Sequence, residues 1–316
     1  MNYIVLDLEW NQSIRPEEEV PGLPFEIIEI GAVRLDADLQ KTGDFSRLIK
    51  PTVYRQMNRV IEALVHLDMK ELERAERFEK VGRDFLTWCE LPDSIFCVWG
   101  ELDLTELQRN LEYFDLPELS DGPIAYLDVQ KLFSLCFEDG KARRSLETAV
   151  DMLGLDKTIP FHRAYSDAFY TAELLRMILR QKPQLRERVS FDVYHPPADR
   201  DREVKIQFDS YMKYISRAFP TKQEAFADRE VASSKCYLCH RNLRKKIRWF
   251  GWNGKHYYCL AYCEKHGYLK GKIRVKRTLE NEVYIVKTTK LISAKEAAEI
   301  KARCERAKEL RKKHKQ

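Results

Sequence analysis

Long apolar runs are missing from this 316-residue sequence, since no stretch approaches the roughly 20 apolar residues that cross a bilayer. The first residues, Met1 to Asp7, include no basic residue and reach an acid after a short apolar run, so we expect no secretory signal. Hydrophobic residues make up 44% of the chain and charged residues 33%, which excludes a disordered chain, a collagen and a small disulfide scaffold. The length predicts about two domains.

The 8 cysteines lack the even distribution of a disulfide framework. Cys89, Cys97 and Cys136 stand singly in apolar contexts, whereas four others gather between residues 236 and 263. A reducing cytoplasm and one metal site account for this usage better than oxidised bridges do. We therefore expect a cytoplasmic protein.

Acidic residues are scarce in one part of the chain. Residues 234–294 contain 3 Asp and Glu against 15 Lys and Arg, whereas residues 1–233 contain 43 against 31. A strongly basic module joined to an acidic body favours a polyanionic partner for the basic part. The alternative interpretation is a solvated basic surface without a partner.

The apolar patterns predict an α/β fold. Strands are expected over residues 2–10, 25–36, 44–49, 94–99 and 124–127, and helices within 61–89 and over 103–114, 129–137, 145–153 and 164–180. Such an order favours a mixed sheet flanked by helices. The prolines between residues 183 and 202 indicate a boundary. We predict a first domain over 1–185, a partly helical linker over 186–233, a small β module over 234–292 and a basic helical tail over 293–316.

Acidic residues recur at the ends of the predicted elements of the first domain. Asp7 and Glu9 lie two residues apart in a strand, so both side chains point to one face. Asp103 opens a helix, and Asp167 lies in the first turn of another, five residues after His162. Each has an ordinary alternative, namely a strand end in water, a helix N-cap or a favourable place at the helix dipole.

Together these segments resemble a known family. Leu6-Asp7-Leu8-Glu9, Trp99 to Asp103 and His162 to Asp167 resemble, in order, the three motifs of the DEDDh (DnaQ-like) 3′→5′ exonucleases. Residues 25–33 and 145–147 resemble the segments that accompany these motifs. The nearest subgroup resembles the KinA-pathway sporulation inhibitor and the enhanced-RNAi exoribonucleases. The resemblance covers roughly residues 1–182 and implies an RNase H-like fold; Trp10 departs from it, because many members have Thr there.

The resemblance implies a metal-dependent reaction that releases nucleoside 5′-monophosphates from a 3′ end. Four carboxylates without Cys or His donors suit Mg²⁺ or Mn²⁺, and two such ions clamp the attacking and leaving oxygens of an in-line displacement. We hypothesise that Asp7 bridges both ions, that Glu9 and Asp167 complete the first, and that Asp103 holds the second, partly through water. His162 is the expected general base.

Residues beside the motifs are candidates for contacting the terminal nucleotide. Trp10 has an aromatic face for base stacking, and Leu23, Phe25 and Tyr165 flank the motifs. For each of them, core packing is the alternative.

The basic module contains a cysteine and histidine pattern with metal-ligand spacing. Cys236 and Cys239 form one pair, and Cys263 and His266 form a second, which predicts a tetrahedral structural Zn²⁺ in a zinc-ribbon-like module. Cys259 is an alternative ligand in place of Cys263 or His266. Basic residues interleave with aromatic residues over 241–258, a pattern suited to phosphate contact and base stacking.

These features predict a metal-dependent 3′→5′ exonuclease that acts on single-stranded RNA or short oligonucleotides. RNA is favoured over DNA because of the resemblance alone. Two alternatives remain, a DNA exonuclease of the proofreading or repair type and a regulatory protein that keeps the nuclease fold but only binds. No membrane partner is expected, and a protein partner of the tail is unknown.

Overall fold

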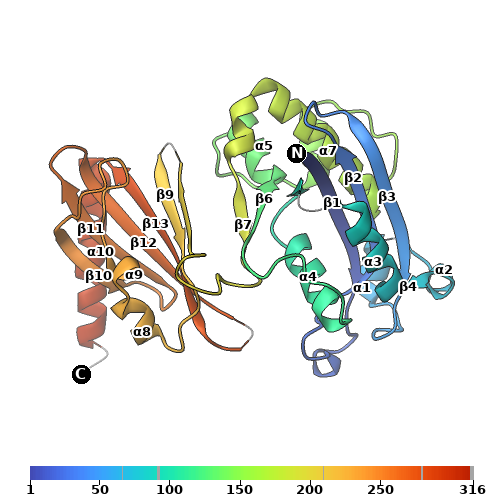
Figure 1. Cartoon of the computed structure of the whole chain (residues 1–316), viewed down its shortest axis with the longest axis horizontal. Helices are drawn as coiled ribbons and strands as arrows, with labels where there is room; N and C mark the ends of the chain where they lie inside the picture. The colour runs from blue at the N-terminus through green and yellow to red at the C-terminus, as the bar shows by residue number, and fades with distance from the viewer. Residues whose placement is uncertain (66, 91–92, 209, 279, 314–316) are drawn as a thin grey trace. The chain divides into compact units, whose positions relative to one another are not determined.

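The computed structural model describes residues 1–65, 67–90, 93–208, 210–278 and 280–313. The chain forms two compact units, one of residues 1–120 and 124–193 and one of residues 121–123 and 194–316. Figure 1 shows a separate β-sheet in each unit. Each unit is described by itself below.

The first unit is built on a mixed seven-stranded sheet in the order β4-β3-β2-β1-β5-β6-β7. β1 pairs with β2 antiparallel and with β5 parallel, so it lies in the middle of the sheet. Its near-continuous apolar sequence suits this buried position. The strands are β1 (Asn2–Asn11), β2 (Glu26–Leu35), β3 (Lys41–Lys50), β4 (Glu76–Arg77), β5 (Ser94–Val98), β6 (Ile124–Asp128) and β7 (Ser190–Asp192).

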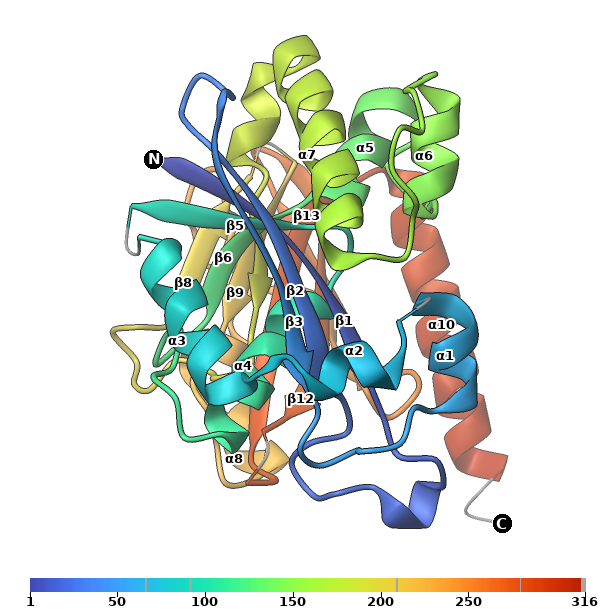
Figure 2. The ribbon, with the colours of Figure 1, turned by 90° about the vertical axis from the view of Figure 1, so that its right-hand side faces the viewer.

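Helices cover both faces of this sheet, and the alternation of β1 gives each face its own core (Figure 2). Tyr3 and Val5 pack in one core with α5 (Val129–Phe137) and α7 (Ala164–Gln181). Ile4, Leu6 and Leu8 pack in the other with α3 (Phe78–Trp88) and α4 (Asp103–Tyr113). The shorter helices are η1 (Pro16–Glu18), α1 (Arg59–Val65), α2 (Met69–Glu73), α6 (Leu146–Met152) and η2 (Pro183–Glu187). The predicted mixed sheet flanked by helices is thus confirmed.

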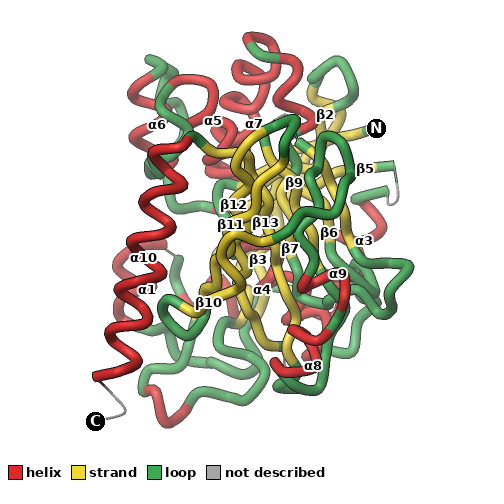
Figure 3. Tube along the Cα trace, turned by 90° about the vertical axis from the view of Figure 1, so that its left-hand side faces the viewer, coloured by secondary structure: helices red, strands yellow, loops and turns green. Residues whose placement is uncertain are grey.

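The second unit is built on a six-stranded sheet in the order β10-β11-β12-β13-β9-β8, with antiparallel neighbours. One face carries an apolar core with the short helices, and the other packs against α10, which runs along β10 and β11 (Figure 3). The elements are β8 (Val204–Gln207), β9 (Tyr211–Ile215), α8 (Lys222–Ala227), α9 (Arg229–Ala232), β10 (Lys245–Gly251), β11 (His256–Cys263), β12 (Gly267–Arg277), β13 (Val283–Ile292) and α10 (Ala294–Lys313).

The segment expected as a partly helical linker over 186–233 differs from that expectation. β7 joins the first sheet, where Asp192 accepts hydrogen bonds from Thr105 and Gln108 of α4. β8 and β9 join the second sheet because Ile215 pairs with Val286, far along the chain. Four- and five-residue strands are too short for their periodicity to show. In the described part of this segment, α8, α9 and the end of η2 are helical.

The tail expected over 293–316 is helical in its described part, as α10. It is an integral part of the second unit, because Ala297, Ile300, Cys304 and Ala307 are buried against the sheet. Within the described part of the chain, we find no helix with the length and apolar character that a membrane span needs.

Candidate active site and cysteine–histidine cluster

Three carboxylates converge where β1 meets the start of α7. Asp7, Glu9 and Asp167 each offer an oxygen, and these atoms lie within 4.8 Å of one another. Asp7 and Glu9 share a face of β1, and the first turn of α7 places Asp167 opposite them. The sequence-predicted convergence of these three residues is therefore present in the structure.

A glycine on β2 permits this approach of helix and sheet. Gly31 lies opposite Asp7 in the β1–β2 register. A Cβ atom on Gly31 would lie 2.0 Å from the backbone carbon of Ala164 and 2.1 Å from the nitrogen of Tyr165. Only a residue without a side chain lets the N-terminus of α7 come this close to the strand.

Asp103 lies beside this cluster at the start of α4. Its Oδ1 accepts a hydrogen bond of 3.3 Å from the backbone N–H of Leu8, between the two acids of β1. The side chain is 8% exposed. Asp103 is therefore tied to β1 rather than acting as the N-cap of α4, a position that Leu102 occupies.

Burial raises the pKa values of all four acids, and the charges of neighbouring carboxylates add to this effect. Burial, followed by the charges of Asp103 and Asp167, raises the pKa of Asp7 well above its usual range. Burial is also the main cause that raises the pKa of Glu9 to about 8, that of Asp103 to about 7 and that of Asp167 to about 6. Carboxylates gathered in this way are costly without a compensating cation.

The residues present fit a divalent cation. Oδ1 of Asp167 is buried and has no hydrogen-bond partner among the described residues. An unpaired buried oxygen within a group of crowded carboxylates is a ready metal ligand, and an all-oxygen donor set suits hard cations. Asp7, Glu9 and Asp167 are the residues placed to hold such an ion.

A fifth acid, Glu29, lies opposite Glu9 in the β1–β2 register and is 1% exposed. Arg163 donates hydrogen bonds of 3.0 and 2.9 Å to its two oxygens, and the backbone N–H of Ala164 adds a third of 3.2 Å. This bidentate pair fixes the segment before α7 to β2. The charge of Arg163 also lowers the pKa of Glu9, against the larger effect of burial.

His162 lies in the bend before α7 with an exposed side chain. Its backbone is left-handed, with φ of 63°, an uncommon conformation for a residue with a Cβ atom. The charge of His162 and a hydrogen bond from its backbone oppose the burial that raises the pKa of Asp167. The predicted histidine therefore lies next to the acid cluster.

The residues expected to contact a nucleotide differ in accessibility. Trp10 and Phe25 are partly exposed, and their rings meet with centroids 5.4 Å apart. The hydroxyl of Tyr165 receives a hydrogen bond of 3.0 Å from Lys41 near the start of β3. Leu23 is 0% exposed, so its side chain offers no surface to a ligand. The expectation that Leu23 contacts the nucleotide is therefore wrong.

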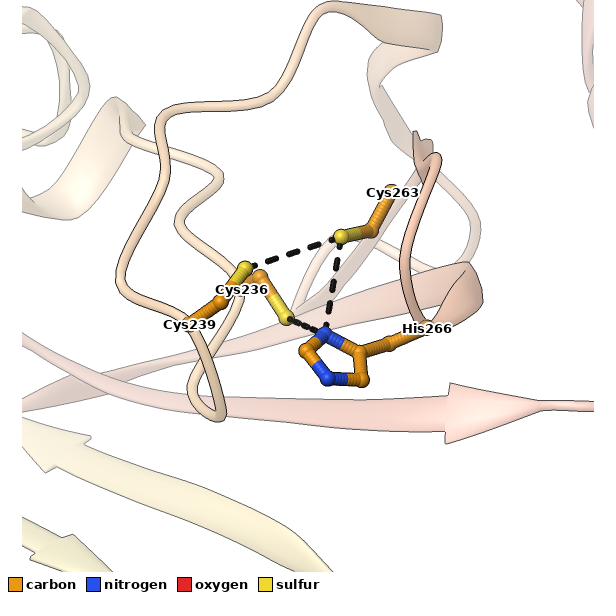
Figure 4. Close-up of side chains that lie close together, drawn as sticks. All are labelled: Cys236, Cys239, Cys263 and His266. Atoms are coloured by element: carbon orange, nitrogen blue, oxygen red, sulfur yellow. Dashed lines mark hydrogen bonds between the residues drawn. The ribbon is translucent and has the colours of Figure 1, made fainter.

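Four side chains of the second unit form a separate cluster (Figure 4). Sγ of Cys236 lies 3.4 Å from Nδ1 of His266, and Sγ of Cys263 lies 3.7 Å from both that nitrogen and Sγ of Cys239. Cys236 and Cys239 belong to the loop before β10, whereas Cys263 ends β11 and His266 belongs to the turn between β11 and β12. The cluster therefore joins the loop before β10 to the β11–β12 connection.

Cys259 does not join this cluster. Its Sγ lies 3.7 Å from Oγ of Ser234, and the side chain is 1% exposed within the sheet. Cys259 precedes Cys263 by an even number of strand residues, but only the residue at the strand end reaches the loop. The geometry thus favours the set that contains Cys263.

Sequence reasoning missed Glu29 and Arg163 as members of the site. Glu29 is an acid with apolar residues on both sides within β2, which is a signal for a buried partner. Arg163 offered no comparable signal, because its partner lies 134 residues away.

Comparison with known proteins identifies the first unit. The family model described as exonuclease (RNase_T) matches residues 4–175. Among curated proteins, the chain is 23% identical over 188 residues to the probable 3′-5′ exonuclease KapD of Bacillus subtilis (strain 168). That match covers 58% of this chain and 87% of KapD.

Two solved structures resemble part of this chain at lower sequence identity. The nuclease domain of 3′hExo, a DEDDh family member bound to rAMP, is 18% identical, with a TM-score of 0.48 over 57% of this chain and 92% of that chain. Exonuclease I of E. coli in complex with a dA16 oligonucleotide is 12% identical, with a TM-score of 0.45 over 59% of this chain. This chain covers only 42% of that enzyme.

Proposed function

The chain belongs to the exonuclease (RNase_T) family, and from this premise we propose that it removes nucleotides one at a time from the 3′ end of single-stranded RNA. The reaction is a hydrolysis of phosphodiester bonds that depends on divalent cations. The 3′-to-5′ direction agrees with the name of the curated relative, a probable 3′-5′ exonuclease. The choice of RNA rests on the resemblance of the three acidic motifs.

The observation that carries this proposal is the group of crowded acids with one unpaired buried oxygen. Asp7, Glu9 and Asp167 would hold the first cation, and Asp103 would help to hold a second beside Leu8. We propose Mg²⁺ or Mn²⁺, because all the donors are carboxylate oxygens. Such ions, when bound, activate the attacking water and stabilise the leaving oxygen.

His162 would accept the proton of the attacking water. Its side chain is exposed in the bend before α7, and the charge of His162 acts on the neighbouring Asp167. An imidazole titrates near neutral pH, as a general base in this range requires. Arg163, the next residue, would hold this segment in place through Glu29.

Trp10, Phe25 and Tyr165 remain the proposed contacts of the terminal nucleotide. Further along, a pocket of about 420 Å³ follows the end of β1 and is lined in part by Gln12, Arg15 and Arg55. Its polar lining suits the sugar-phosphate backbone of the preceding nucleotides. Buried Asn11 holds this region together through hydrogen bonds to the backbone of residues 54 and 56.

We propose a structural Zn²⁺ at Cys236, Cys239, Cys263 and His266 in the second unit. Three sulfurs and one nitrogen are a donor set of structural zinc sites. The backbone N–H of Arg241 lowers the pKa of the Cys239 thiol and so favours the thiolate that binds metal. All eight cysteines are free thiols, which fits a reducing compartment, and we propose the cytoplasm.

The proposal is tested with RNA and DNA oligonucleotides of equal sequence that carry a label at the 5′ end. We expect a ladder of products that shorten from the 3′ end, faster for RNA than for DNA, with Mg²⁺ or Mn²⁺ and not without them. His162→Ala should retain metal binding and lose most turnover. Internal cleavage, or shortening that is independent of divalent cations, would contradict the proposal, and faster loss of DNA would assign the DNA alternative instead.

A further inference from the structure

The second unit carries a large excess of positive charge, which the proposed exonuclease chemistry of the first unit does not use. Residues 234–294 contain 15 Lys and Arg against 3 Asp and Glu. The aromatic residues expected to stack on bases are largely occupied within the unit. The ring nitrogen of Trp249 donates to the carbonyl of Ala232, and Phe250 lies in the core under α10. A binding surface must therefore be sought elsewhere on this unit.

Strand β12 supplies it. Lys270, Lys272, Arg274 and Lys276 alternate along the strand with Leu269, Gly271, Ile273 and Val275. Alternate residues of a strand point to opposite faces, so the four cations form one row on one face. The apolar residues between them turn to the other face, where Ile273 and Val275 pack in the core with α8 and α9. The spacing along this row is roughly 6.6 Å, two residues of a strand.

The neighbouring strands extend this row across the sheet. Lys290 of β13 lies directly opposite Lys270, and Thr288 lies opposite Lys272. On the other side, Tyr258 of β11 lies opposite Lys272, and His256 lies opposite Arg274. The cations of β12 therefore share one face with Lys290, Thr288 and His256, and with the apolar Leu260 opposite Lys270.

Helix α10 covers this face only in part. Its buried residues pack in one cluster with Phe250, Tyr258 and Leu260, and with Tyr268 of β12 and Ile292 of β13. Arg303 of α10 adds a further cation, with its guanidinium 5.0 Å from the Tyr258 ring centroid and 5.3 Å from that of the exposed Trp252. Arg274 and Lys290 remain exposed.

The row carries many more cations than acids, and Glu296 of α10 is an acid whose charge acts on both Lys270 and Lys290. Among the ion pairs of the described residues, none involves Lys270, Lys272, Arg274 or Lys290. Like charges directly opposite on one face of a sheet are destabilising. Burial together with Arg303 and Lys272 lowers the pKa of Lys270, and burial together with Lys272 and Arg274 lowers that of His256. The row thus has a positive potential that an external anion would offset.

We infer that the face of β12 that carries Lys270, Lys272, Arg274 and Lys276, beside α10, binds the phosphate backbone of single-stranded nucleic acid. The inference rests on the proposed function, because the bound strand is the body of the substrate whose 3′ end is degraded. A regular row of cations matches a polyanion with regularly spaced charges, and the partly exposed His256 and Trp252 beside it suit exposed bases better than a duplex or an acidic protein. Because one chain carries both the active site and this row of cations, a substrate long enough to contact both is bound more tightly, whereas a short substrate is not.

The test uses the full-length chain with Lys272→Glu and Arg274→Glu combined. The matched control is Lys222→Glu with Arg229→Glu, which changes the charge equally on α8 and α9, over the opposite face of the same sheet. Binding of a labelled single-stranded oligonucleotide is measured by anisotropy across salt concentrations, with Asp7→Asn present in each chain to prevent cleavage. Turnover of a dinucleotide and of a long RNA is measured without Asp7→Asn.

We expect the double variant to bind the long oligonucleotide at least tenfold more weakly, with a salt slope smaller by about 1.4, since each lost phosphate contact removes about 0.7 for single strands. The control and dinucleotide turnover should stay near wild type. An unchanged salt slope would overturn the inference. So would loss of binding to anionic phospholipid vesicles without loss of oligonucleotide binding. Absence of dinucleotide and RNA turnover in the wild-type chain would instead contradict the proposed function.

Discussion

The guanidinium of Arg163 donates two hydrogen bonds, of 3.0 and 2.9 Å, to the buried carboxylate of Glu29, which lies 134 residues away in the sequence. Glu29 lies opposite Glu9 on the neighbouring strand, and Arg163 lies between His162 and the first residue of α7. One ion pair therefore connects the strand that carries the acids to the segment that carries the histidine. It also places one cation among five carboxylates.

Replacement of Arg163 by Ala tests this connection. The variant leaves Glu29 buried without its partner, and we expect a loss of about 2–3 kcal/mol in the free energy of unfolding. A fully buried pair would lose more, but the Arg163 side chain is 36% exposed. Because the segment that carries His162 is then no longer held to β2, kcat should fall about 10- to 100-fold. We expect little change in Mn²⁺ affinity or KM.

Two variants control for this prediction. Arg163→Lys keeps the charge and loses the bidentate geometry, so its kcat should lie between those of the wild type and Arg163→Ala. Arg176→Ala removes an ion pair with Glu173 on the same helix and should change stability by less than about 1 kcal/mol. Unchanged kcat in Arg163→Ala would show that the pair does not position His162.

Gly31→Ala tests the close approach of α7 to β2. The added methyl group would lie 2.0 Å from the Ala164 backbone, so the helix must shift away from the sheet. We expect a destabilisation of about 1–3 kcal/mol and a loss of Mn²⁺ affinity, because Asp167 moves with the helix. Thermal unfolding and calorimetric Mn²⁺ titration measure both effects.

Gly43→Ala on the adjacent strand β3 is the matched control. Its Cβ would lie 3.5 Å from the Arg34 side chain, an ordinary contact. This variant should bind Mn²⁺ as the wild type does. Equal behaviour of the two glycine variants would contradict the account of the helix approach.

The raised pKa values predict how the stability of the metal-free protein depends on pH. Asp167, Asp103 and Glu9 have folded pKa values of about 6, 7 and 8, against ordinary values of 3.8, 3.8 and 4.5. Between the ordinary and the raised values, the folded protein binds more protons than the unfolded chain, so stability falls as pH rises. We expect a lower Tm at pH 8 than at pH 5.5 without divalent ions.

Mn²⁺ should remove most of this difference, because it replaces the protons and binds more tightly as pH rises. Glu9→Gln should flatten the metal-free profile in the upper part of this range. A metal-free Tm that rises from pH 5.5 to pH 8, equally in both proteins, would contradict the electrostatic description of the cluster.

The cysteine–histidine cluster predicts one Zn²⁺ per chain. Cys236→Ser should remove the metal and lower the unfolding temperature of the second unit, because the two loops lose their connection. Cys259→Ala should keep the metal, since that thiol lies outside the cluster. Metal analysis of the purified variants measures this directly, and zinc lost from Cys259→Ala but kept in Cys236→Ser would reverse the ligand assignment.

Much of this architecture was predictable because its signals are local. The apolar run of β1 and the 3.6-residue spacing of α7 are readable from neighbouring residues, and the bounds of both agree with the prediction to within one residue. The three acidic motifs identified their family because residue type and order suffice for that.

The parts that escaped prediction depend on contacts between distant segments. β9 has its partner in β13, far along the chain, and β8 pairs with β9. Leu23 lies beside a motif, yet the chain turns it into the interior, where the Tyr54 hydroxyl donates to its carbonyl. By contrast, the spacing of Cys263 and His266, which equals that of Cys236 and Cys239, favoured the four residues that the structure brings together.

The central claim is that Asp7, Glu9, Asp103 and Asp167 form one divalent-cation site that drives removal of 3′ nucleotides. Calorimetric titration of Mn²⁺ into the zinc-loaded chain, with mononucleotide release measured on the same samples, tests it most directly. We predict two Mn²⁺ ions per wild-type chain, and loss of tight binding together with release in Asp7→Asn. A folded wild-type chain that binds no Mn²⁺, or an Asp7→Asn chain with full release, would contradict the account.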